Sequence, residues 1–295
     1  MTRNPALLPL LATIIGIGFF SAMDAVMKSA ALAVGAFSAY FLRCAIGVCL
    51  AAPIWALTNL RWPERHVLRI HLTRGVVGAF MGLSFFYAIV RLPLAEAIAL
   101  SFISPLIALY LAAILLGERV EQKAIVAAML GLIGVIIIVG GRIGRERMTE
   151  DAALGLAALF LSALLYAWNL ILQRQQALVA SPIEVSVFQN GIAGSVLLLG
   201  TPLLLVIPQD HTVWIDLVSG AVLTILAVLF LSWAYARAEA QVLVPIEYTG
   251  FLWAALFGWL MFDEMVTPAT VAGAVLIVIG CWIATRQTPP EQTAI

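Results

Sequence analysis

LPLAEAIALSFISPLIALYLAAILLGERVEQKAIVAAMLGLIGVIIIV, residues 92–139, is the stretch of sequence that decides the fold. It contains a long apolar run at 94–116, a charged break at 117–123 and a second apolar run at 124–139. About 18 consecutive apolar residues indicate a helix long enough to cross a bilayer, and the first run exceeds that length while the second approaches it. The pattern therefore predicts two membrane-spanning helices joined by a short charged turn.

The same plan returns at residues 238–285, as an apolar run, an acidic break at Asp263 and Glu264, and another apolar run. The shift that carries Glu118 onto Glu264 superposes Leu106 on Leu252, Ala108 on Ala254, Ile133 on Ile279 and Gly134 on Gly280. The repeated order of helix, acid and helix, more than these few identities, predicts that the chain consists of two duplicated halves.

Composition limits the class of protein. Hydrophobic residues are 63% of the chain and charged residues 11%, which is more apolar surface than a soluble fold of this length can bury. An integral membrane protein is expected, with the lipid bilayer as a partner. The formal net charge of zero argues against a nucleic-acid partner, which would require a basic face. The three cysteines lie in apolar runs and the three histidines lack ligand spacing, so no metal, cofactor or enzymatic centre is expected.

Ten helices are predicted, at residues 7–27, 36–57, 72–90, 94–116, 124–139, 152–172, 183–207, 213–236, 240–262 and 269–284. They divide into a first five-helix repeat at 1–141, a joining loop at 142–151, a second repeat at 152–286 and a polar tail at 287–295 that we expect to be disordered. Because five crossings is an odd number, the second repeat would enter the bilayer upside down. The expected fold class is an all-α membrane protein built from two inverted repeats, the arrangement of many secondary transporters.

Basic residues favour the cytoplasmic side of a membrane. If the N-terminus is cytoplasmic, about twice as many basic residues fall on the inner side as on the outer side, although three arginines at 142–147 run against the bias. The inner set comprises Arg3, Arg61, Arg65, Arg69, Arg74, Arg119, Lys123, Arg174, Arg237 and Arg286. We therefore expect both termini in the cytoplasm and the protein in a plasma membrane, as in a bacterial inner membrane.

Charged residues inside the expected helices are informative because each costs roughly 2.5–3.5 kcal/mol at the bilayer centre. Asp24 and Lys28 lie one helical turn apart, and Arg43 should reach a similar depth on the next helix. These residues form either a structural ion pair or part of a substrate site, and the sequence leaves both interpretations open.

A shift of about half the chain length brings Asn169 opposite Asp24, Gln173 opposite Lys28, and Gln189 or Asn190 opposite Arg43. Polar residues on corresponding helices of an inverted repeat would meet at the interface between the halves, where we expect a cavity. The alternative for Asn169 and Gln189 is interhelical hydrogen bonding. Trp168 is the tryptophan that we expect to line the cavity.

Glu247 follows Pro245, which removes a backbone donor and favours a kink in the helix. Tyr248 adds a hydroxyl beside the acid. An acid beside a kink inside a membrane is a functional hypothesis by default, and we expect Glu247 to bind substrate or protons. The alternative is an acid satisfied by a neighbouring arginine or hydroxyl. Glu118 and Glu264 end long apolar runs and are expected to pair with turns or basic neighbours.

The chain resembles the drug/metabolite transporter superfamily, and specifically its EamA family, over nearly its whole length. The resemblance rests on FSAMDAVMK at 20–28, FLR at 41–43, SP at 104–105, LGE at 116–118, PIEYTGFLW at 245–253 and FDE at 262–264. It implies a secondary transporter that moves an amino-acid, nucleoside, S-adenosylmethionine or vitamin-like metabolite by alternating access, with proton coupling as an open alternative. A non-transporting receptor or scaffold is the competing interpretation, which the short loops disfavour.

Overall fold

The computed structural model describes residues 7–58, 62–104, 107, 122–143, 149–238, 243, 246 and 249–285. The described elements are helices: α1 (Leu7–Val34), α2 (Ala36–Thr58), α3 (Arg65–Ile89), α4 (Leu94–Ser101), α6 (Gln122–Ile143), α7 (Glu150–Val179), α8 (Pro182–Leu198), α9 (Thr201–Leu204), α10 (His211–Arg237), α12 (Gly250–Phe262) and α13 (Pro268–Thr285).

Within this described part, five helices are long and apolar enough to cross a membrane: α1, α2, α3, α7 and α10. Shorter apolar stretches occupy α6, α12 and α13. The all-helical membrane fold agrees with the sequence prediction. Ten crossings stay a prediction, because part of the chain lies outside the described residues and several helices are short.

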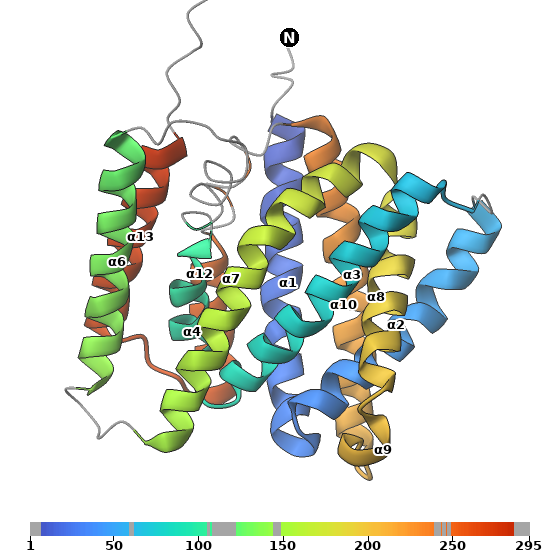
Figure 1. The fold of residues 1–295 in the computed structure, drawn as a ribbon. Helices are drawn as coiled ribbons and strands as arrows, with labels where there is room; N and C mark the ends of the chain where they lie inside the picture. Colours follow the sequence, from blue (N-terminus) through green and yellow to red (C-terminus); the bar gives the residue numbers. More distant parts are fainter. Residues whose placement is uncertain are drawn as a thin grey trace, which may run out of the picture.

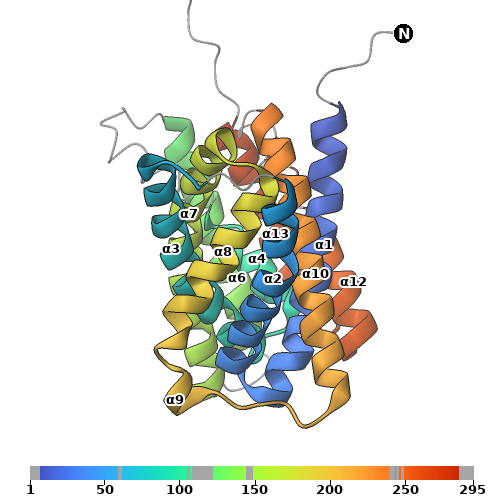
Figure 2. The same ribbon diagram turned by 90° about the vertical axis from the view of Figure 1, so that its right-hand side faces the viewer.

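The helices alternate in direction along the chain. In Figure 1, α1, α3, α6, α8 and α12 run downward, while α2, α4, α7, α10 and α13 run upward. The chain enters α1 and leaves α13 at the same end of the bundle, and Figure 2 shows α9 at the opposite end. The first helix of one half therefore runs opposite to the first helix of the other, as an inverted repeat requires.

The packing partners repeat between the halves as well. If α1, α2, α3, α4 and α6 correspond to α7, α8, α10, α12 and α13, the packing of α1 on α10 has its counterpart in that of α3 on α7. The pairs α2 with α8, α4 with α12, and α6 with α13 each join a helix to its own counterpart. This pattern is that of an approximate two-fold axis between the halves.

Several helix boundaries differ from the sequence prediction; α7, for example, ends at Val179 instead of residue 172. α1 continues seven residues beyond Met27 and ends at Val34, because helix-forming residues follow until Gly35 adopts a φ of 84°. α3 begins at Arg65 instead of residue 72, so basic residues that were expected in a loop belong to a helix. The helix expected at 183–207 ends at Leu198 and is followed by the single turn of α9.

Candidate functional site: a central cavity between the halves

A cavity of about 250 Å³ lies at the centre of the bundle. Its lining comes from α1, α2, α3 and α4 of the first half and from α7, α8, α10 and the start of α12 of the second, whereas α6 and α13 contribute none of the lining residues described. The site is therefore shared by both halves. Its volume suits a small organic molecule, although it lies just below the usual range for drug-sized ligands.

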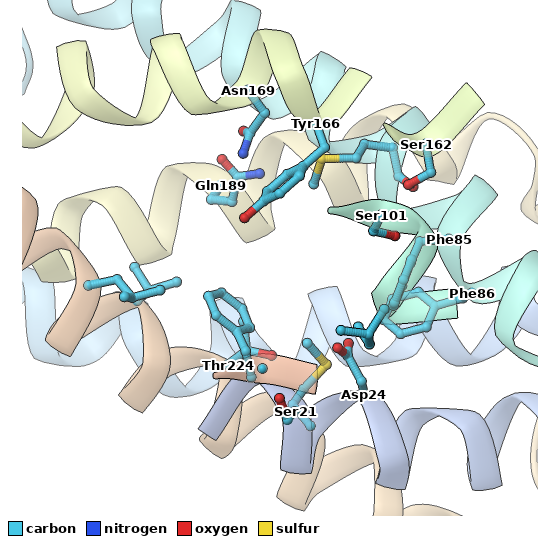
Figure 3. Close-up of a pocket in the computed structure, with 18 of the residues that line it drawn as sticks. Ser21, Asp24, Phe85, Phe86, Ser101, Ser162, Tyr166, Asn169, Gln189 and Thr224 are labelled. Atoms are coloured by element: carbon cyan, nitrogen blue, oxygen red, sulfur yellow. The ribbon is translucent and has the colours of Figure 1, made fainter. Parts of the chain in front are cut away.

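The cavity has two polar walls, which face each other in Figure 3. Tyr166 and Asn169 from α7 and Gln189 from α8 lie on one side, and Ser21, Asp24 and Thr224 from α1 and α10 lie on the other. The aromatic rings of Phe85 and Phe86 from α3 lie toward one end of the space between the walls. A ligand between these walls meets hydrogen-bonding groups on both faces and an apolar surface at one end.

Asp24 and Arg43 bring an acidic and a basic side chain to the cavity, and both are buried. Arg43 Nη1 donates to Thr224 Oγ1 at 2.7 Å, and its guanidinium lies 5.0 Å from the centre of the Tyr40 ring. Arg43 Nε is buried without a hydrogen-bond partner among the described residues. An unsatisfied buried donor on a cavity wall is unfavourable in the empty protein and would be satisfied by an acceptor on a ligand.

Lys28 does not pair with Asp24. Its side chain is buried and forms an ion pair with Glu264 Oε1, and Lys28 Nζ donates to the Leu92 carbonyl at 2.9 Å. Glu264 Oε2 in turn accepts from the Leu94 N–H at 2.7 Å, at the first residue of α4. The prediction that Glu264 pairs with a turn and a basic neighbour is confirmed, and it takes Lys28 away from Asp24.

Arg74 is a charged cavity residue that sequence reasoning missed, because it was assigned to an inner loop or helix end; Ser21, Tyr40 and Thr224 are uncharged lining residues that were missed as well. The helix begins earlier than the apolar run, so Arg74 is buried on α3 and faces α7. Its Nε donates to Asn169 Oδ1 at 3.1 Å, its Nη2 donates to Gln173 Oε1 at 3.1 Å, and its Nη1 donates to Gln176 Oε1. The available signal was a face of polar and small residues at helical spacing, formed by His71, Arg74, Gly75, Gly78 and Gly82.

The structure brings together four of the seven predicted site residues, Asp24, Arg43, Asn169 and Gln189, on one cavity. Trp168 does not line it, since 46% of its surface is exposed on the outside of α7. Consecutive residues on a helix point about 100° apart, so Trp168 cannot share the inward face of Asn169. Glu247 and Tyr248 lie outside the described residues, although Gly250, a few residues later, lines the cavity.

The sequence profile of the EamA-like transporter family matches the chain twice, at residues 7–140 and 153–286. The chain belongs to the EamA-like transporter family. The two matches cover both halves of this family member, which fits the two-repeat architecture predicted from sequence, and the protein is a transporter of the drug/metabolite class.

Relatives of this EamA family member carry transporter names. The pseudopaline exporter CntI of Pseudomonas aeruginosa is 29% identical over 90% of this chain and 92% of its own length. A riboflavin transporter of Vibrio cholerae is 28% identical over 75% of this chain and 71% of its own. A solved crystal structure superposes with a TM-score of 0.64 at 21% identity, covering 94% of this chain and 96% of the other, which supports the fold.

The two family matches are offset by 146 residues (153 minus 7), the same shift that carries Glu118 onto Glu264. At this offset the cavity lining pairs between the halves as Ile17 with Ala163, Phe20 with Tyr166, Met23 with Asn169, Arg43 with Gln189, Gly82 with Val228 and Phe85 with Leu231. The cavity thus lies on the approximate two-fold axis.

The same offset corrects two of the sequence pairings by one residue. Lys28 corresponds to Arg174 and not to Gln173, and Asn169 corresponds to Met23 and not to Asp24. The contacts agree with this register: Arg174 Nη1 donates to the Ala238 carbonyl at 2.9 Å, and Ala238 is the counterpart of Leu92. The pairing of Gln189 with Arg43 holds.

Proposed function

We propose that this protein is a secondary transporter that carries a small organic metabolite across the membrane by alternating access, with the central cavity as its substrate site. The observation that carries the proposal is the cavity itself, which both inverted repeats line at equivalent positions. A site on the axis between two inverted halves can be exposed to either side by rocking one half against the other.

The substrate class follows from the walls. Asp24 is the described acid among the lining residues and Arg43 and Arg74 are the described cations, so the site suits a polar molecule that carries an acidic group. Phe85, Phe86 and the other aromatic rings suit a flat or apolar body. Relatives named for pseudopaline, riboflavin and S-adenosylmethionine support a metabolite of the amino-acid, nucleoside, S-adenosylmethionine or vitamin-like kind.

Glu247 belongs to this site in our proposal. At the repeat offset Glu247 corresponds to Ser101 and Tyr248 to Phe102, and both of these first-half residues line the cavity. This correspondence supports Glu247 as an acid that binds substrate or a proton, with Tyr248 beside it.

In this proposal the gates are the contacts at the two ends of the bundle that close the cavity. They involve Lys28 and Glu264 at one end and Arg174 at the other. The ion pair of Lys28 with Glu264 joins the first half to the second near the α3–α4 turn, at the lower end of the bundle in Figure 1. Arg174 reaches the carbonyls of Tyr235 and Ala238 where α10 ends, at the upper end. The repeat offset makes Glu118 the counterpart of Glu264, so Arg174 and Glu118 would form the second gate when the first one opens.

Purified protein tests the function in two steps. A thermal-shift screen against a metabolite library identifies a compound that raises the unfolding temperature, because a ligand that binds only the folded state stabilises it by mass action. The stabilising compound, radiolabelled, is then followed into proteoliposomes. Counterflow above that of protein-free liposomes, lost in Arg43→Gln, is the expected result. Binding without any flux would favour a receptor or scaffold over a transporter.

A further inference from the structure

His71 is the centre of a buried polar cluster beside the cavity. The proposed transport function uses Arg74 of this cluster, but it does not use His71, Gln176 or Glu184. Its ring has no exposed surface and stacks on Phe188, with ring centres 4.4 Å apart and an angle of 13° between the planes. His71 Nε2 lies 3.0 Å from Glu184 Oε1, and His71 Nδ1 lies 2.5 Å from Gln176 Nε2. Both ring nitrogens are therefore engaged.

The hydrogen-bond chemistry of this cluster defines the protonation state of His71. Arg74 has only donors, so Gln176 must present its amide oxygen to Arg74 Nη1 and its amide nitrogen to the ring. A donor that faces His71 Nδ1 requires this nitrogen to accept. The ring is then neutral, with its proton on Nε2 donated to the Glu184 carboxylate.

Proton uptake would reverse this arrangement, because both nitrogens of an imidazolium are donors. The Gln176 amide would have to rotate by half a turn to offer its oxygen to the Nδ1 proton, and its NH₂ group would then face the Arg74 guanidinium. Two donors cannot bond to each other. A proton on His71 Nδ1 and the Arg74 guanidinium therefore compete for the single amide oxygen of Gln176.

The charges around the ring also favour the release of Arg74 when His71 is protonated. The charged groups that face His71 are Glu184 from α8 and Arg74 from α3 itself, and α7 contributes the neutral Gln176. The other helices that pack on α3 add no charged group to the ring within the described residues. A positive ring would repel Arg74, whose remaining contacts are to Asn169 and Gln173 at the cavity wall.

We propose that His71 is a proton-binding site and that Gln176 relays its occupancy to Arg74 in the cavity. The proton enters past Glu184, which lies in the first turn of α8 with a side chain that is 10% exposed. Protonation turns Gln176, releases Arg74 toward the cavity and makes its guanidinium available to an acidic group on the substrate. Proton binding and the binding of such a substrate then favour each other, which is the linkage that a proton-coupled carrier needs. This inference rests on the proposed function only for its use in transport.

The relay is tested without any substrate, by NMR of purified protein labelled with ¹⁵N at histidine and arginine. His71→Gln and Arg74→Met assign the two signals. At alkaline pH the His71 ring should show the tautomer with its proton on Nε2. On acidification the Arg74 Nε–H signal should move with the same midpoint as the His71 ring. If the Arg74 signal of the wild-type protein stayed fixed while His71 titrated, the proposal would be overturned.

Two variants on α7 separate the relay from a general loosening of the cluster. Gln176→Met removes the amide between His71 and Arg74 and should uncouple the two titrations. Gln173→Met removes another amide that bonds to Arg74 but does not touch His71, and it should leave them coupled. Coupling that survives Gln176→Met also counts against the relay. These readouts need no flux, so a failure here is distinct from a failure of the transport proposal.

Discussion

Lys28 and Arg174 make the same contact at opposite ends of the bundle. Lys28 Nζ donates to the Leu92 carbonyl and Arg174 Nη1 donates to the Ala238 carbonyl, each at 2.9 Å. Both donors and both acceptors are separated by the repeat offset of 146 residues. Each cation thus ties the first helix of its half to the connection that follows the third helix. In this structure Lys28 also holds Glu264 of the other half.

Breaking the ion pair between Lys28 and Glu264 should open the end of the bundle at which Lys28 lies. In Glu264→Gln the amide can still accept from Leu94 N–H, but the buried Lys28 loses its ion pair with Glu264, which is unfavourable. We expect a cysteine introduced at the cavity residue Ser21, in a background without native cysteines, to react on the order of tenfold faster with an impermeant maleimide, equivalent to about 1.4 kcal/mol.

The matched control for this prediction is Asp263→Asn. Asp263 is the neighbouring acid and adopts a φ of 53°, a conformation that asparagine tolerates. It makes no contact with Lys28 among the interactions described, so the labelling rate should not change. Equal rates in Glu264→Gln and in the parent protein would show that the ion pair does not control access.

Removing the Arg74 guanidinium should destabilise the protein strongly for a single substitution. Arg74→Met leaves the amide oxygens of Asn169, Gln173 and Gln176 without this donor, and an unsatisfied buried acceptor costs about 1–3 kcal/mol. Thermal unfolding in detergent, followed by tryptophan fluorescence, should show a lower midpoint. Arg69→Met on the exposed face of the same helix should leave the midpoint nearly unchanged, and an equal fall in both variants would contradict the structural role of Arg74.

The architecture was predictable from sequence because it depends on long-range regularities. Apolar run length indicates a membrane helix, and the repeated run around Glu118 and Glu264 indicates the duplication. The four predicted cavity residues were found for a related reason. A polar group such as Asp24 or Asn169 in an otherwise apolar helix needs a partner or a cavity, whatever the rest of the fold is.

Other features of the site could not be predicted, because they depend on three-dimensional geometry that the length of an apolar run does not reveal. The sequence pairing of Asp24 with Lys28 used their spacing, but the buried Lys28 side chain reaches Glu264, which lies 236 residues later in the chain. Arg74 was misassigned because the apolar run marks the apolar part of a helix and not its start. Trp168 was predicted to line the cavity because it is next to Asn169 in the sequence, although adjacent helical residues point in different directions.

A methyl group at Gly82 should disturb the cavity. An added Cβ would lie 2.5 Å from Cζ of the Tyr40 ring, which is rigid and bonded through its hydroxyl to the Gly78 carbonyl at 2.8 Å. Gly82→Ala should therefore lower the unfolding free energy by about 1–3 kcal/mol and weaken binding of the compound found in the thermal-shift screen.

Gly140→Ala is the matched control. Among the described residues, no atom outside its own helical turn lies within 4 Å of its added Cβ, so replacement of a helical glycine there should stabilise α6 by roughly 0.5–1 kcal/mol. A neutral Gly82→Ala would mean that Tyr40 moves aside freely.

Glu247→Gln should abolish coupled transport while leaving expression and folding intact. The side chains are nearly equal in volume, so packing is retained, but glutamine can neither carry a proton nor offer a negative charge to a cationic group. The offset that pairs Glu247 with the cavity residue Ser101 leads us to expect the loss in flux and not in stability. Flux of the identified compound in proteoliposomes, with and without a pH gradient, measures it. Glu150→Gln, at an exposed acid in the first turn of α7, should transport like the parent protein. Full, gradient-dependent flux in Glu247→Gln would remove this residue from the mechanism and leave Asp24 as the acid that the cavity offers to a proton or a cationic group.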